Sequence, residues 1–167
     1  MNHPSGIAIS KRIGQIDQVL TAPRITEQET IEGCQTAVQS LVSTVWVKPC
    51  YVRQTINVFH NTSLNIGTFI GYPYGINTTY VKLAETKRAL SEGAIMVGLS
   101  LNIGDIVGEN YTAIIEEIKC ISGLAHMNGA GCLVLIDLWL VDVSQVLHLA
   151  EAAIKGGAEG AILQVKS

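Results

Sequence analysis

The sequence has few charged residues for its length. Among its 167 residues only 15% are charged and 48% are hydrophobic, which predicts a substantial apolar core and not disorder. The eleven basic side chains are scattered along the chain and the formal net charge is -3, so no basic stripe is available for nucleic acid. We therefore expect residues 1–167 to form a single globular domain that has no nucleic-acid partner.

Long apolar runs and paired metal ligands are also missing. No window approaches the roughly eighteen uninterrupted apolar residues of a membrane span, and the opening MNHPSGIAISKRIG lacks the apolar centre of a secretory signal. This predicts a cytoplasmic protein without a membrane span. Because no CxxC pair occurs and the four histidines share no ligand spacing, we expect no metal and no cofactor. We expect reduced and mostly buried thiols at Cys34, Cys50, Cys120 and Cys132.

Apolar segments of strand length alternate with amphipathic segments of helix length. Thr26 and Glu29 have the spacing of a helix capping box, and apolar residues follow them at helical intervals. Alternation of this kind predicts parallel strands covered by helices, hence an α/β fold. Glu116 and Glu117 are expected on the solvated face of their helix. The predicted helices span 26–41, 50–60, 79–92, 111–127 and 143–155, and the predicted strands span 15–20, 42–48, 64–72, 93–104, 132–139 and 160–166.

Four stretches of the chain carry motifs of one enzyme family. They are IDQVLTAPRITEQE at 16–29, IGYPYGINTTYVKLAE at 70–85, LNIG at 101–104 and VLIDLWLVD at 134–142. In order and spacing they resemble segments of the class I deoxyribose-phosphate aldolases: IDHTLLKP, IGFPxGxxxTxxKxxE, IDMVINIG and VIIETxxLTD. That family folds as a (β/α)8 barrel and cleaves 2-deoxyribose 5-phosphate through a lysine Schiff base. The resemblance implies an incomplete TIM-type barrel of about six parallel strands, without the family's last two.

The resemblance also implies that the catalytic residues are replaced. The family's proton-transferring aspartate falls on Gly98, its Schiff-base lysine on Ile162 and its reactive-position cysteine on Trp46. A further family lysine falls on Ala22, and the sequence holds no counterpart of the last strands, which supply a second lysine and the phosphate loops. Glycine cannot carry a proton and isoleucine cannot form an imine. Lys166 lies four strand residues beyond Ile162, roughly 13 Å away, too far to substitute. We therefore expect no catalytic residue.

Polar residues remain at three positions of the ancestral pocket: Asp17, Asn102 and Asp137. They are candidates for binding a small polyol or sugar phosphate, or they hydrogen-bond backbone amides at the strand ends. In the family register Trp46 and Ile162 both point into the barrel, where they would fill the space that a substrate occupies. We therefore expect Trp46 to be shielded from water.

These features predict a catalytically degenerate, aldolase-like protein that is retained as a scaffold or subunit of a larger assembly. The alternative is an active aldolase or a sugar-phosphate-binding protein that uses residues from another chain. An incomplete barrel leaves two open strand edges and apolar interior surface. Because soluble monomers rarely expose such surface, we expect a homo-oligomer or a dedicated protein partner.

Overall fold

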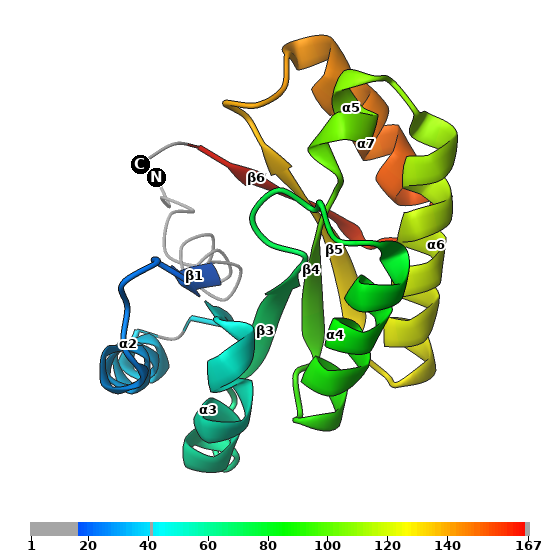
Figure 1. Ribbon diagram of the computed structural model, residues 1–167. Coiled ribbons are helices and arrows are strands. Elements are labelled where there is room, and N and C mark those ends of the chain that lie inside the picture. Colours follow the sequence, from blue (N-terminus) through cyan, green and yellow to red (C-terminus); the bar gives the residue numbers. More distant parts are fainter. Residues whose placement is uncertain (1–16, 41, 166–167) are drawn as a thin grey trace, which may run out of the picture.

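A computed structural model describes residues 17–40 and 42–165, which form one parallel sheet with helices packed against it (Figure 1). The described strands follow one another across the sheet in chain order, and every adjacent pair is parallel. They are β1 (Asp17–Leu20), β2 (Thr44–Val47), β3 (Asn65–Ile70), β4 (Met96–Ser100), β5 (Gly131–Asp137) and β6 (Gly160–Gln164). This confirms the predicted α/β fold and its six parallel strands, arranged as an incomplete (β/α)8 barrel.

Helices connect consecutive strands. They are α2 (Glu27–Gln39), α3 (Val52–Phe59), α4 (Thr79–Ser91), α5 (Ile103–Val107), α6 (Tyr111–Met127) and α7 (Val143–Lys155), and a 3-10 turn, η1 (Pro49–Tyr51), precedes α3. The short helix α5 was not expected from the sequence. The strand predicted over 93–104 ends at Ser100, because the Asn102 side chain accepts a hydrogen bond from the Gly104 amide and so begins a helix. Within the described residues, no helix has both the length and the apolarity to cross a membrane.

Two capping boxes fix where helices begin. The Thr26 hydroxyl accepts from the Glu29 amide at 3.2 Å, and the Glu29 carboxylate accepts from the Thr26 amide at 2.8 Å, as the sequence spacing predicted. Asp142 and Gln145 form the same reciprocal pair at the start of α7. Each box satisfies amide groups that have no partner within the helix, so both helices start at defined residues.

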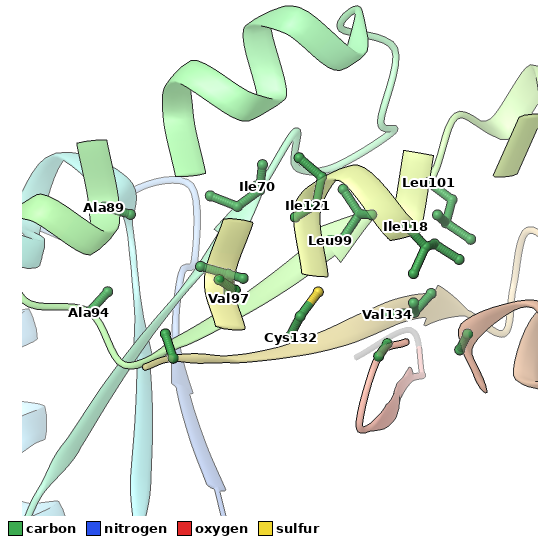
Figure 2. Close-up of a cluster of buried hydrophobic side chains, with 14 of the residues drawn as sticks. Ile70, Ala89, Ala94, Val97, Leu99, Leu101, Ile118, Ile121, Cys132 and Val134 are labelled. Atoms are coloured by element: carbon green, nitrogen blue, oxygen red, sulfur yellow. The ribbon is translucent and has the colours of Figure 1, made fainter. Parts of the chain in front are cut away.

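The larger core lies between the sheet and the helices. In β4 and β5 the side chains of Val97, Leu99 and Val134 project to this side, where Ile118 and Ile121 of α6 cover them (Figure 2). All five side chains are almost completely buried. Residues between them in the strands point to the opposite side, which we call the inner face, because successive strand side chains alternate. No helix of the described residues crosses that face between β1 and β6 in Figure 1.

The thiols divide evenly between core and surface. Cys34 and Cys132 are buried, whereas Cys50 and Cys120 are exposed. The prediction of mostly buried thiols is therefore wrong for two of the four. Cys50 lies on the 3-10 turn η1, and Cys120 lies on α6 between the buried positions Ile118 and Ile121.

Candidate functional site on the inner face of the sheet

A stack of aromatic rings occupies the inner face. The Trp46 and Phe69 rings lie nearly parallel, with centroids 4.8 Å apart and an interplanar angle of 10°, and the Tyr72 ring lies 5.5 Å from that of Phe69. Leu135 completes the buried part of this cluster, and the half-buried Ile162 packs against it. The exposed fraction of Trp46 is 1%, which confirms the prediction that this residue is shielded from water.

Glycine makes room for the stack at position 98. A Cβ atom added to Gly98 would lie 2.5 Å from Cδ1 of Phe69, closer than non-bonded atoms approach. The Phe69 ring therefore occupies the space into which a longer side chain at position 98 would project. Substituting an acidic residue there would require the ring to move.

Asp17 holds the stack at the amino end of the strands. The Trp46 indole Nε1–H donates to the Asp17 carboxylate at 2.9 Å. A buried indole N–H needs such an acceptor, so this bond satisfies the one polar group of the ring. Asp17 begins β1, whereas Asp137 ends β5, so these two candidate residues lie at opposite ends of the sheet.

Asn102 is occupied in capping α5. Its side-chain oxygen accepts from the Gly104 amide at 3.0 Å, and its amide nitrogen donates to Asp105 at 2.7 Å. Both polar ends of this side chain are therefore satisfied within the turn.

Asp137 differs from the other two candidates because one carboxylate oxygen is unpaired. Its Oδ1 is buried without a hydrogen-bond partner among the described residues, and the same holds for Oγ of Ser100. Both residues line one small cavity of about 20 Å³. Burial raises the pKa of the Asp137 carboxyl above its usual range, because the charged form loses its hydration.

Sequence reasoning missed three inner-face residues near Asp137. They are Ser100, whose hydroxyl is unpaired, and Gln164 and Tyr72, which are joined by a 3.4 Å hydrogen bond from the Gln164 amide to the Tyr72 hydroxyl. The alternation of side chains along a strand indicates that two of them lie on the inner face. Ser100 lies two residues beyond Gly98, and Gln164 lies two beyond Ile162, so both share the inner face with residues already assigned to it. Tyr72 follows the end of β3, where alternation no longer applies.

Two clefts open beside the aromatic stack. One, of about 290 Å³, is lined by Thr21, Pro23, Lys48, Pro49, Phe69, Tyr72 and Pro73. The other, of about 240 Å³, is lined by Val19, Phe69, Leu135, Ile162, Leu163 and Gln164. Both walls are mainly apolar. In the part of the chain that the structure describes, no three side chains of the His, Cys, Asp and Glu types come together in a way that could hold a metal ion.

Curated relatives of this chain are deoxyribose-phosphate aldolases. The chain is 30% identical over 146 residues to a deoxyribose-phosphate aldolase of Desulfitobacterium hafniense (strain DSM 10664 / DCB-2), covering 87% of this chain and 67% of that protein. The chain belongs to the deoxyribose-phosphate aldolase family. The aldolase of Mycoplasma mycoides is 28% identical, with 86% of this chain and 72% of that protein covered. The chain thus spans about two-thirds of the length of these relatives. No family model matches.

Solved structures share the fold. The tetrameric deoxyribose-phosphate aldolase of Aeropyrum pernix superimposes with a TM-score of 0.80 at 22% identity, over 95% of this chain and 70% of that one. A triosephosphate isomerase of Bartonella henselae, at 13% identity, gives 0.58 over 90% of this chain and 65% of that one. The sheet is therefore part of a barrel of the type that deoxyribose-phosphate aldolases form.

Residues 70–85, the segment that most resembles the aldolase family, form hydrogen bonds and an ion pair that connect helices to strands. Lys82 is completely buried on the helix side of the sheet, where its Nζ donates to Glu117 at 2.8 Å and to the Ser100 carbonyl at 3.0 Å. Glu85 accepts from the Gly71 amide at 2.8 Å. The expectation that Glu117 lies on a solvated face is wrong, because its side chain is 12% exposed and paired with Lys82. These residues join α4 and α6 to the ends of β3 and β4.

Lysine amines of the described residues lie away from the inner face or are occupied. Lys48 is on the inner side, at the mouth of the larger cleft, but its Nζ donates to the carbonyls of Pro23 and Ile25 at 2.9 and 3.0 Å. Lys87, Lys119 and Lys155 lie on helices. Lys166 lies outside the described residues.

Proposed function

We propose that this chain is a non-catalytic member of the deoxyribose-phosphate aldolase family that serves as a subunit or scaffold in a larger protein assembly. The observation that carries the proposal is the Trp46–Phe69 stack, which occupies the space in front of position 98, where there is no side chain, while position 162 is isoleucine. Schiff-base catalysis needs an amine and space for the carbonyl carbon next to it. Among the described residues, no lysine amine supplies this nucleophile beside Ile162.

The carboxylates of this chain also give no support to the acid–base chemistry of the family. Proton transfer in such a reaction requires a side chain that can gain and lose a proton within hydrogen-bond reach of the substrate. Asp17 is bonded to Trp46, and Asp137 lies at the carboxyl end without a lysine beside it among the described residues. Neither Asp17 nor Asp137 therefore acts as a general base beside a nucleophilic amine.

The sheet edges support the assembly part of the proposal. Within residues 17–40 and 42–165, β1 and β6 each pair on one side only. Their surroundings carry exposed apolar side chains, with Val19 53%, Leu163 55% and Val165 68% accessible. Unpaired edges next to apolar surface favour association, so a second copy or a dedicated partner would cover them.

Borohydride trapping tests the catalytic part. The purified chain is mixed with 2-deoxyribose 5-phosphate or with acetaldehyde, reduced with borohydride and measured by intact mass spectrometry, alongside an active aldolase of the family. We expect a specific single adduct on the active enzyme only. A specific lysine adduct on this chain, located by peptide mapping, would show that it retains Schiff-base chemistry.

Light scattering behind size exclusion tests the assembly part. We expect a mass above that of one 17.9 kDa chain for the protein alone or with the partner that co-purifies from native cells. A monomer in dilute solution that brings no partner from native cells would contradict this part.

A second candidate is a sugar-phosphate-binding or active protein that takes residues from another chain. The unpaired Asp137 and Ser100 atoms favour it, because a ligand would satisfy them. Repeating the trapping on the native assembly distinguishes the two: an adduct that forms only in the assembly supports the second candidate.

A further inference from the structure

A small cavity at the carboxyl ends of β4 and β5 contains two polar atoms that lack a partner. Ser100, with only 2% of its surface exposed, and Asp137 both line it, and Oγ of Ser100 and Oδ1 of Asp137 have no partner among the described residues. The two residues come from adjacent strands, since Ser100 pairs with Leu135 and Asp137 lies two residues further along the same face. Buried polar atoms nearly always have a partner, so an unpaired pair at one cavity indicates a missing group.

The size and walls of the cavity define that group. Its volume of about 20 Å³ holds one water-sized group, since a water needs about 10–15 Å³ on the same scale. The remaining walls are mostly apolar and include Leu135, Leu140 and Val141. A carboxylate oxygen only accepts hydrogen bonds, and a serine hydroxyl can also accept a hydrogen bond. A group that pairs with both atoms is therefore a hydrogen-bond donor, and the apolar walls favour a donor that is attached to an apolar stem.

Charge decides between a neutral donor and a cation. Asp137 is half-buried, and its buried oxygen Oδ1 is costly in the charged form unless it meets a positive charge or other donors. Lys82 does not serve this purpose, because its amine donates to Glu117 and to the Ser100 carbonyl from the helix side. An anion would be repelled by Asp137.

We propose that this cavity binds the ammonium group of a primary alkylamine, either a free amine or the side chain of a lysine on a partner chain. The ammonium donates to Asp137 Oδ1 and Ser100 Oγ inside the cavity, and the alkyl stem leaves the cavity through its opening. This site goes beyond the proposed assembly role and does not depend on it.

A titration of the full chain followed by methyl NMR tests the site. The probes are n-butylammonium, n-butanol and butyrate, which share a four-carbon stem and differ in charge. We expect n-butylammonium to shift the methyl signals of Leu135, Leu140 and Val141, n-butanol to shift them more weakly, and butyrate to leave them unchanged. Equal shifts with butyrate, or no shift with n-butylammonium at tens of millimolar, as when water alone fills the cavity, would overturn the proposal.

Matched variants locate the ammonium. Asp137→Asn should weaken n-butylammonium binding about tenfold or more, because a charge-assisted hydrogen bond is lost. Ser100→Ala should weaken it less, and Glu116→Gln, a charge change on the exposed face of α6, should leave it unchanged. Unaltered binding by a folded Asp137→Asn protein, judged from its methyl spectrum, would refute the site, and the butyrate comparison stays decisive if that variant does not fold. Binding of N-acetyl-lysine methylamide as strong as that of n-butylammonium would assign the site to a partner's lysine, whereas binding of the free amine alone would assign it to a small molecule.

Discussion

On the helix side of the sheet, the segment at 70–85 keeps the glycine, lysine and glutamate of its family pattern, and these residues are joined by hydrogen bonds and an ion pair. On the inner face, positions 46, 98 and 162 hold a tryptophan, a glycine and an isoleucine, and the Trp46 ring stacks on that of Phe69. The two faces belong to the same strands, yet one holds a polar network and the other holds a stack of aromatic rings.

The difference shows which constraints act on each face. The helix side must bury the charged Lys82 completely, so each of its partners is needed for the fold itself. The inner face needs polar groups only if a reaction takes place there. Without one, apolar side chains that fill the space add stability, and the substitutions at 46, 98 and 162 are compatible with one another as a packed set.

Removing the indole should have the largest effect of the inner-face changes. Trp46→Ala deletes a ring with 1% exposure, and we expect a loss of about 3 to 5 kcal/mol in the free energy of unfolding. Trp139→Ala is the control, since 48% of that residue is exposed, and it should cost much less. Urea denaturation measures both. Acrylamide quenching of single-tryptophan variants adds a second test: Trp46 should be poorly quenched, and efficient quenching of both tryptophans would mean that the inner face is open.

Breaking the buried ion pair tests the helix side. Lys82→Met leaves the Glu117 carboxylate without its cation, and we expect a destabilisation of about 3 kcal/mol. Lys119→Met is the matched control on α6, because the Lys119–Glu116 pair is at least half exposed on both sides and should contribute less than about 1 kcal/mol. Adding Glu117→Gln to Lys82→Met should recover part of the loss. Equal costs for the two single variants would remove the distinction between the faces.

Restoring a side chain at position 98 should be unfavourable because of the Phe69 ring. Gly98→Ala places a Cβ 2.5 Å from that ring, and we expect a cost of about 1 to 3 kcal/mol. Gly123→Ala on α6, where nothing lies within 4 Å of the added Cβ, should be neutral or stabilising. Phe69→Leu combined with Gly98→Ala should cost less than the sum of the two single changes. Strict additivity would show that Phe69 and position 98 do not compete for space.

The sequence was sufficient for the strands, their order and the burial of Trp46. Strand runs, helix periodicity and the capping box at Thr26 and Glu29 are local signals, and the family motifs fix the order of the elements. Asn102 is an instructive exception. It ends a strand-like run of residues, but its side chain bonds Gly104 and starts α5, so a capping signal was read as part of a strand.

Local sequence patterns did not predict which side chains pair with one another. Asp17 and Trp46 are 29 residues apart, and Lys82 and Glu117 are 35 apart, so only the folded chain brings them together. Glu117 was expected on the solvated face of its helix, but the neighbouring helix α4 carries the buried amine of Lys82 at that point. Which of the three candidate site residues keeps an unpaired atom also depended on such partners.

The smallest expected effect is a difference between Asp137 and Asp142 in how the stability of the folded state depends on pH. Burial raises the pKa of Asp137, so its charged form destabilises the folded state at neutral pH, and this penalty disappears as the pH falls below the unfolded-state pKa of about 3.9. Asp137→Asn should therefore raise the melting temperature at pH 7 and have little effect near pH 3. Hydrogen bonds from Ser144 and the Gln145 amide lower the pKa of Asp142, so its charged form stabilises the fold at neutral pH and that stability is lost as the pH falls through its folded-state pKa.

Asp142→Ala should accordingly lower the melting temperature at pH 7, with a smaller difference in acid. Calorimetry of both variants between pH 3 and 7 measures the two slopes. Opposite signs would show that the carboxylate at the mouth of the inner face lacks the donors that the helix cap possesses. If both substitutions change the melting temperature at pH 7 in the same direction, Asp137 has hydrogen-bond donors in solution. The polar groups of the inner face are then as well paired as those of the helix side.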